Sequence, residues 1–181
     1  IDYPCKLSCI LWFAGCNLRC KYCYNFELLS PQTFLAQEQV LDFLSSRVEL
    51  LDGVVCSGGE CSMWGDRLIA FVEKIKSMGF CVKIDTNGSN PRVLQALIEK
   101  RVIDYVALDF KAPIYKLEKI CGKDYFKEFE ESLNLLRDST LSYEIRTTFH
   151  SDLLSPAEIG GMRDWLKERG YEGKYYVQGF V

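Results

Sequence analysis

Six short, mostly apolar segments recur along the chain, and this repetition constrains the fold more than any other feature. Each is rich in β-branched or aromatic residues. Most are too continuously apolar for a strand with one face in water, which would alternate apolar and polar residues. We therefore predict six buried parallel strands. They cover Leu7–Phe13, Gly53–Cys56, Cys81–Asp85, Tyr105–Phe110, Tyr143–Phe149 and Lys174–Gln178.

Amphipathic segments lie between these runs and predict helices, because their apolar residues fall mainly on one side of a helix. Asn90-Pro91 reads as a cap followed by proline in the first turn, and Gly170 ends the last segment. The predicted helices cover residues 35–47, 67–78, 90–100, 125–137 and 155–169.

Alternation of strand and helix implies a parallel α/β sheet with helices outside it. Six strands are fewer than the eight of a closed barrel of ~250 residues, so we predict an open, partial (β/α)6 barrel. A doubly wound flat sheet is the alternative, because strand order cannot be read from one sequence. With no internal repeat or linker, we expect a single domain over residues 1–181. The chain opens on Ile rather than Met, which leaves open that it is trimmed at both ends.

Composition argues against two classes of partner. The chain carries 22 Lys and Arg against 25 Asp and Glu, a net charge of −3 with no basic stripe, so we expect no nucleic-acid binding. Its apolar stretches, such as residues 9–16, are far shorter than the ~20 residues of a membrane-spanning helix. We therefore expect no membrane partner.

Cysteine is the outlier in the composition, with nine residues against a single histidine. An odd number of cysteines in a chain with an adequate core does not suit a secreted disulfide framework. One histidine also supplies a Cys/His zinc site poorly. Reduced cytoplasmic thiols, some of them holding an iron–sulfur cluster, fit better.

Thiol and polar groups gather at or just after the ends of the six predicted strands. Because the carboxyl ends of parallel strands meet at one rim, where barrels bind their ligands, we expect these groups to form one site. The groups are Cys16/Cys20/Cys23, Ser57–Glu60, Asp85–Gly88, Asp109–Lys111, Arg146–His150 and Gln178–Gly179.

Cys16, Cys20 and Cys23 form the sharpest motif. Three thiolates within eight residues can hold three irons of a [4Fe–4S] cluster and leave the fourth iron open to chelate a substrate. The alternatives are a zinc knuckle that borrows a fourth ligand, and incidental core thiols.

These motifs resemble a known family. The C-x3-C-x2-C spacing with Tyr22 before the last cysteine, followed after the next strand by Gly58-Gly59-Glu60, is similar to the signature of radical S-adenosylmethionine enzymes. The resemblance spans nearly the whole chain. It implies the same partial (β/α)6 barrel, with a [4Fe–4S] cluster and S-adenosylmethionine as cofactors.

A second set of motifs narrows the resemblance: Ile1–Pro4, Gly15–Cys20, Cys23–Asn25, Asp85–Pro91, Asp109–Pro113, Tyr143–Thr148 and Tyr176–Gln178. Together they resemble the activating proteins of glycyl radical enzymes, most closely that of anaerobic ribonucleoside-triphosphate reductase. Two positions depart from the family pattern. Cys61-Ser62 follow Glu60 where Pro-Thr is frequent, and Tyr24 stands where a histidine is often found.

The resemblance implies an activity. An electron from a flavodoxin-like or ferredoxin-like donor reduces the cluster, S-adenosylmethionine is cleaved to methionine and a 5′-deoxyadenosyl radical, and the radical takes hydrogen from a glycine of the partner enzyme. One alternative is activation of another glycyl radical enzyme, such as pyruvate formate-lyase. Another is a radical enzyme acting on a small molecule or peptide. A non-enzymatic electron carrier is the third, although it would have no use for the other rim motifs.

The resemblance also implies roles for single residues. Glu60 would accept the amine of S-adenosylmethionine, with Gly58 and Gly59 allowing the backbone to approach it. Asp85 and Asp109 would hold a monovalent cation together with backbone oxygens of Thr86 and Ala107. The remaining assignments are Asn87 at the methionyl group, Lys111 at the carboxylate, Arg146 at the carboxylate or ribose, and Tyr22 against adenine.

Each of these residues has a purely structural alternative. The Gly-Gly-Glu motif can be an ordinary turn with Glu60 at a helix N-terminus, and Arg146, as a buried arginine, can have a structural partner in the neighbourhood of Glu144. For the remaining residues, the structural explanation is a turn at Asp85 and at Asn87, a solvated strand end at Asp109, a solvated Lys111 and core packing of Tyr22.

The other cysteines are assigned no chemistry. We expect those inside predicted strands, Cys9, Cys56 and Cys81, to be small buried hydrophobes. Loop positions are expected for Cys5, Cys61 and Cys121, and no compact triplet among the six predicts a second cluster. His150 is expected at the surface or in a loop.

Overall fold

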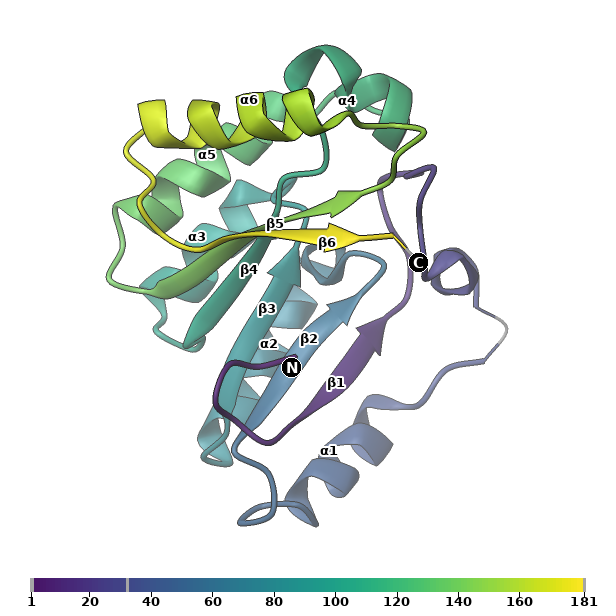
Figure 1. Ribbon diagram of the computed structural model, residues 1–181. Helices are drawn as coiled ribbons and strands as arrows, with labels where there is room; N and C mark the ends of the chain where they lie inside the picture. Colours follow the sequence, from purple (N-terminus) through teal and green to yellow (C-terminus); the bar gives the residue numbers. More distant parts are fainter. Residues whose placement is uncertain (1, 32, 181) are drawn as a thin grey trace.

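The computed structural model describes residues 2–31 and 33–180, and its six strands form one parallel sheet (Figure 1). The strands lie in the order β1-β2-β3-β4-β5-β6, each hydrogen-bonded in parallel to the next along the chain. They are β1 (Ser8–Phe13), β2 (Gly53–Gly58), β3 (Cys81–Thr86), β4 (Tyr105–Asp109), β5 (Ser142–Phe149) and β6 (Tyr175–Gly179). All six predicted strands are confirmed.

Strand order decides between the two predicted architectures. A doubly wound sheet reverses its order at a switch point, whereas here the order runs in one direction. Because crossovers between parallel strands are right-handed, consecutive crossovers in one direction place the helices on one face of the sheet, as Figure 1 shows. In the described part of the chain β1 and β6 are the two edges, so the partial barrel is open.

Within residues 2–31 and 33–180, six helices and two short 3-10 turns connect the strands. Five of the helices were predicted, with ends that differ by at most two residues. The elements are α1 (Gln37–Ser45), α2 (Asp66–Ser77), α3 (Pro91–Glu99), α4 (Ile114–Cys121), α5 (Phe126–Arg137), α6 (Pro156–Glu168), η1 (Phe26–Leu29) and η2 (Cys61–Trp64).

Helix α4 was not predicted, and it corrects the placement of one cysteine. Its eight residues follow Pro113, bury Leu117, Ile120 and Cys121, and end at Gly122 with φ of 76°. Gly122 takes the left-handed conformation that favours glycine after a helix. Cys121 is therefore a buried helix residue rather than a loop thiol. Cys61 is likewise buried, in η2.

The two faces of the sheet differ in chemistry. Alternate residues of the central strands, including Val82, Leu108 and Ile145, pack against the helices in the hydrophobic core. The residues between them point to the opposite, inner face. There Lys83 of β3 is paired with Glu144 of β5. The interior of the partial barrel is thus polar at its centre.

The amino-terminal segment closes one end of the barrel. Lys83 donates from Nζ to the carbonyl oxygen of Asp2 at 2.5 Å, and the ring of Tyr3 packs 5.9 Å from that of Tyr105. Tyr105 begins β4, so this contact lies at the amino ends of the strands. The predicted rim lies at the opposite end of the barrel, where the strands finish.

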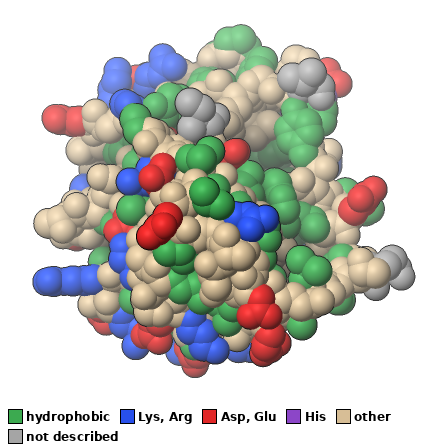
Figure 2. All heavy atoms as spheres, turned by 90° about the horizontal axis from the view of Figure 1, so that it is seen from below, with side chains coloured by type: hydrophobic (Ala, Val, Ile, Leu, Met, Phe, Trp, Pro, Cys, Tyr) green, Lys and Arg blue, Asp and Glu red, His purple; other side chains and the backbone are tan. Residues whose placement is uncertain are grey.

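The surface carries no field of a single sign on the face seen in Figure 2. Acidic and basic side chains are interspersed there with hydrophobic ones, in keeping with the net charge of −3. Within the described residues, no helix has both the length and the apolar character needed to cross a membrane.

Candidate active site

The segment after β1 carries the three predicted cluster cysteines, and residues 14–25 are called the cysteine loop below. Neighbouring segments hold its backbone on three sides. Gly15 N donates to Leu28 O at 2.7 Å, Glu60 N donates to Gly15 O at 2.8 Å, and Arg19 N donates to Cys121 O at 2.8 Å. These bonds connect the loop to η1, to the end of β2 and to the end of α4.

Cys16, Cys20 and Cys23 are each partly exposed, and none is in a disulfide. Cys16 Sγ accepts a hydrogen bond from Leu18 N at 3.4 Å, and Cys23 N donates to Cys20 O at 3.1 Å. Burial raises the pKa of the Cys16 thiol. A hydrogen bond from the Cys121 thiol lowers the pKa of Cys20 to about 7.

The donor set suits a [4Fe–4S] cluster, because three free thiols on one loop match the thiolate ligands that such clusters take. Among the residues that the structure describes, no three His, Cys, Asp or Glu are grouped as ligands of a single metal ion. Cys20 is turned to Cys121. The loop thus supplies ligands of the right chemistry for an iron–sulfur cluster.

The two glycines after β2 allow contact between backbones. Gly58 has φ of 122°, and a Cβ on it would lie 2.3 Å from the backbone nitrogen and oxygen of Phe13. A Cβ on Gly59 would lie 2.0 Å from Gly15 O. The motif was predicted to let the backbone approach a cofactor. In this structure, what it approaches is the start of the cysteine loop.

Glu60 is only 2% exposed, and three groups donate to its carboxylate. Thr86 Oγ1 and Ser62 N donate to Oε1 at 2.7 and 3.1 Å, and Asn87 N donates to Oε2 at 2.7 Å. Burial raises the pKa of Glu60, and the hydrogen bonds from Asn87, Ser62 and Thr86 counter that rise. The carboxylate therefore caps η2, as the structural alternative required, and also ties β2 to the end of β3.

Asn87 continues this network into the cysteine loop. Its Nδ2 donates to Asn17 Oδ1 at 3.1 Å, and its Oδ1 accepts from Ser89 N at 2.9 Å. Asn17 Nδ2 in turn donates to Ser89 Oγ at 2.7 Å. Asn17 and Ser89 had no predicted role. Their positions inside two of the recognised motifs were the only sequence signals that could have drawn attention to them.

A charged cluster fills the inner face beside these loops. It comprises Lys83, Asp85, Asp109, Lys111, Glu144 and Arg146, three positive and three negative side chains. Arg146 lies between the two aspartates, with Nη1 3.4 Å from Asp85 Oδ2 and Nη2 3.0 Å from Asp109 Oδ1. The structure thus gives Arg146 structural partners, although aspartates rather than the neighbourhood of Glu144.

Lysines complete the cluster on either side. Lys83 Nζ is 2.9 Å from Asp85 Oδ1, and Lys111 Nζ is 2.9 Å from Asp109 Oδ2. Burial disfavours the charged form of Asp109, but Arg146 and Lys111 outweigh it and hold its pKa below the ordinary value. Lys111 is therefore not a solvated lysine. In this structure a guanidinium lies between the carboxylates predicted to hold a cation.

Tyr22 packs in the hydrophobic core, and His150 packs against another aromatic ring. Tyr22 is buried in the hydrophobic core and donates from its hydroxyl to Lys111 O at 3.1 Å, which is the structural alternative. His150 follows β5 and packs its ring 4.7 Å from that of Phe180. Phe180 also stacks on Tyr24 at 4.4 Å, so the end of β6 lies against the cysteine loop.

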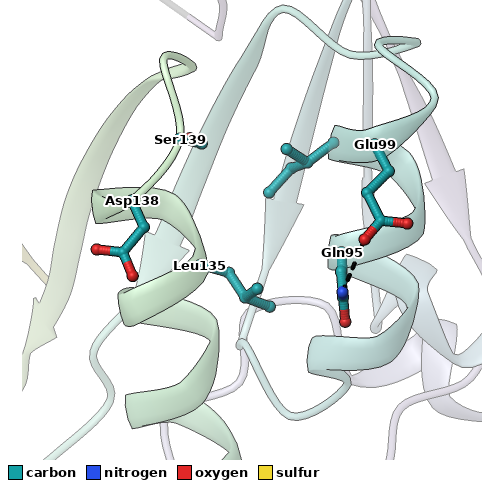
Figure 3. Close-up of a pocket in the computed structure, with 6 residues that line it drawn as sticks. Gln95, Glu99, Leu135, Asp138 and Ser139 are labelled. Atoms are coloured by element: carbon teal, nitrogen blue, oxygen red, sulfur yellow. Dashed lines mark hydrogen bonds between the residues drawn. The ribbon is translucent and has the colours of Figure 1, made fainter.

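A cavity of about 220 Å³ lies away from this rim, between the ends of α3 and α5 (Figure 3). Leu135 and Gln95 face each other across it, and Gln95 is hydrogen-bonded to Glu99 of the same helix at 2.7 Å. No predicted site residue lines it. This cavity is therefore separate from the predicted site residues at the rim.

Comparison with known proteins identifies the family of the chain. The pattern of the family described as the radical SAM superfamily matches residues 10–159. The chain belongs to the radical SAM superfamily. Among solved structures, anSMEcpe with bound AdoMet superimposes with a TM-score of 0.78 over 97% of this chain and 52% of that one. At 18% identity that likeness shows a shared fold alone.

Curated relatives place the chain more narrowly. A Methanocaldococcus jannaschii protein, classed by its name among the glycyl-radical enzyme activating enzymes, is 32% identical over 177 residues, 93% of this chain and 72% of the relative. Pyruvate formate-lyase-activating enzyme of Streptococcus mutans is 29% identical over 123 residues, 61% of this chain and 46% of that enzyme. Within the superfamily the chain falls among the glycyl-radical enzyme activating enzymes. It spans less than half the length of the Streptococcus relative.

Proposed function

We propose that this chain cleaves S-adenosylmethionine with a [4Fe–4S] cluster held by Cys16, Cys20 and Cys23 and generates a glycyl radical on a partner enzyme, anaerobic ribonucleoside-triphosphate reductase. The observation that carries the proposal is the link between the cysteine loop and the Gly-Gly-Glu motif. The backbone hydrogen bond from Glu60 N to Gly15 O joins them at the rim, and a second, from Gly59 N to Phe13 O, joins the motif to the residue just before the cysteine loop. The partner is supported by the motifs from Asp85–Pro91 to Tyr143–Thr148.

The cluster, when bound, supplies the electron for homolytic cleavage of the sulfonium, and the protein supplies position and charge. Glu60 offers a buried carboxylate to the amine of S-adenosylmethionine, and Asn87 offers an amide to the methionyl group. Lys111 and Arg146 are cations suited to the cofactor's carboxylate. Because both are already paired with Asp109, binding would exchange one carboxylate partner of each cation for another, and the Asp109 carboxylate would then need a new cation beside it.

Binding of a monovalent cation depends on the position of Arg146. We propose that it binds between Asp85 and Asp109 only when Arg146 has turned to the cofactor's carboxylate. Without either cation the two aspartates would repel each other and one would be protonated. Backbone oxygens of Thr86 and Ala107, at the ends of the same strands, complete the proposed site.

The proposed electron donor is a flavodoxin-like or ferredoxin-like protein, and the proposed compartment is the cytoplasm. Both fit low-potential cluster chemistry and nine cysteines without a disulfide. Activation of pyruvate formate-lyase is the second candidate function, because several relatives bear the name of its activating enzyme.

The test is electron paramagnetic resonance of mixtures that contain reductant, S-adenosylmethionine, the reconstituted protein and one candidate partner from the same source. We expect a glycyl doublet on the reductase, absent when its target glycine is replaced by alanine. The Cys16→Ala variant is the matched control and should give no doublet. A doublet only on pyruvate formate-lyase would reassign the partner. Cofactor cleavage without a radical on any partner would overturn the proposed function.

A further inference from the structure

The end of α4 lies directly against the cysteine loop. Arg19 N donates to Cys121 O at 2.8 Å, and Lys21 N donates to Ile120 O at 3.0 Å. These two bonds flank Cys20 on one segment and involve Cys121 on the other. A disulfide requires its two Cα atoms to be close together, and these two bonds bring the segments that carry Cys20 and Cys121 side by side.

The side chains make the same pairing. The thiols of Cys20 and Cys121 are hydrogen-bonded to each other. A Cβ on the next residue, Gly122, would lie 3.3 Å from Arg19 Cβ, so the two segments have little room to separate. Cys121 is fully buried, whereas Cys20 is partly exposed. The Cys20 thiol is thus open to a reagent from solvent, whereas the Cys121 thiol is shielded from it.

We propose that in the cluster-free protein Cys20 and Cys121 form a disulfide by exchange with a small disulfide such as oxidised glutathione, and that this bond excludes the cluster. The Cys20 thiolate attacks one glutathione sulfur, forms a mixed disulfide and releases one reduced glutathione. The Cys121 thiolate then attacks Cys20 Sγ and releases the second. Two protein thiols lose two electrons and two protons, and one glutathione disulfide becomes two thiols.

The exclusion of the cluster by this disulfide rests on the proposed function, because it requires Cys20 to be a cluster ligand. A disulfide at Cys20 removes one of three thiolates from the cysteine loop, so iron could not be loaded until a thiol reductant reversed the bond. The same bond would protect Cys20 from irreversible oxidation. Neither Cys16 nor Cys23 has a thiol outside the cysteine loop hydrogen-bonded to it in the described structure, so the inference concerns Cys20 alone.

The test uses the full chain freed of iron by a chelator and treated with oxidised glutathione. Free thiols are then alkylated and the proteolytic fragments are weighed. We expect a linked Cys20–Cys121 fragment from the unaltered chain. The Cys121→Ser variant should stop at a glutathione adduct on Cys20. The Cys56→Ser variant, which removes an equally buried thiol, should still give the linked fragment.

Three outcomes would overturn the proposal. Glutathione remaining on Cys20 of the unaltered chain would show that Cys121 does not resolve the adduct. Linkage of Cys20 to Cys16 or Cys23 would show that α4 is not the partner. Oxidised protein that carries the Cys20–Cys121 link and still takes up its full iron content on reconstitution would overturn the exclusion of the cluster. That last result would also count against Cys20 as a ligand, independently of any glycyl radical measurement.

Discussion

Gly59 lies so close to Gly15 that a Cβ on Gly59 would be 2.0 Å from the carbonyl oxygen of Gly15. Gly15 immediately precedes the first cluster cysteine, and its oxygen also accepts the hydrogen bond from Glu60 N. The residues predicted to bind the cofactor and those predicted to bind the cluster are therefore one mechanical unit. A substitution in either loop should therefore alter the structure of both.

Gly59→Ala should reduce iron loading as well as cofactor binding, because the added Cβ displaces the backbone next to Cys16. Forcing an atom into a packed site costs about 1–3 kcal/mol of unfolding free energy. Denaturant unfolding and iron content measure the two effects. Gly160→Ala is the control, because Gly160 lies inside α6 with nothing within 4 Å of its Cβ position. This variant should have an unfolding free energy about 0.5–1 kcal/mol higher than that of the unaltered chain. Normal iron loading in Gly59→Ala would separate the two loops.

Replacing Cys16, Cys20 or Cys23 by Ala should abolish the roughly four irons of a cysteine-bound [4Fe–4S] cluster. Cys9→Ala and Cys81→Ala should leave iron content unchanged, since neither thiol is in the cysteine loop. Iron analysis after anaerobic reconstitution measures the difference. Equal loss of iron in Cys61→Ala or Cys121→Ala would contradict a cluster held by three cysteines.

Arg146→Met should make stability depend on potassium. Removing the guanidinium leaves Asp85 and Asp109 facing each other, and breaking a buried ion pair in this way costs about 3–5 kcal/mol. A monovalent cation could then occupy the gap and restore part of the loss. The measurement is the unfolding free energy of cluster-free protein in potassium chloride and in choline chloride at equal ionic strength. We expect a larger difference between the salts for the variant than for the unaltered chain. Identical responses would argue against a cation site between the two aspartates.

Glu158 should contribute an acid-sensitive contact between α6 and α4. Its carboxylate is 2.7 Å from Lys116 Nζ and accepts from Tyr115 Oη and Ser155 N, each at 2.8 Å. The hydrogen bond from Lys116, followed by those from Ser155 and Tyr115, lowers the pKa of Glu158 to about 2. Because the folded-state pKa lies below the unfolded value of about 4.3, the stabilisation is present above pH 4.3 and is lost as pH falls toward 2.

Unfolding free energy measured across that pH range checks this contribution. Unfolding free energy should fall less steeply with decreasing pH in Glu158→Gln than in the unaltered chain, because the variant has no carboxyl at this position to protonate. Glu168→Gln changes an exposed carboxylate at the other end of the same helix and serves as the control. An unchanged slope in Glu158→Gln would show that the contact with α4 makes no such contribution.

Most of the fold could be predicted from local pattern. Apolar runs marked all six strands, and amphipathic periodicity marked five helices, because burial of one face imposes its period on the residues within each element. Helix α4 was missed because its eight residues are barely two turns and follow directly on Pro113. The missed helix was not a detail, since it carries Cys121 to the cysteine loop.

In the candidate site, too, the features that are local in the chain could be predicted and the long-range contacts could not. A cluster-binding loop is local in the chain, so the spacing of Cys16, Cys20 and Cys23 was legible in the sequence by itself, as was the placement of polar groups at strand ends. The partners of Glu60, Asn87 and Arg146 were not legible. Glu60 meets Thr86 across 26 positions and Arg146 meets Asp85 across 61. Strand register and loop packing set those distances, and only the folded barrel brings such side chains within hydrogen-bond range.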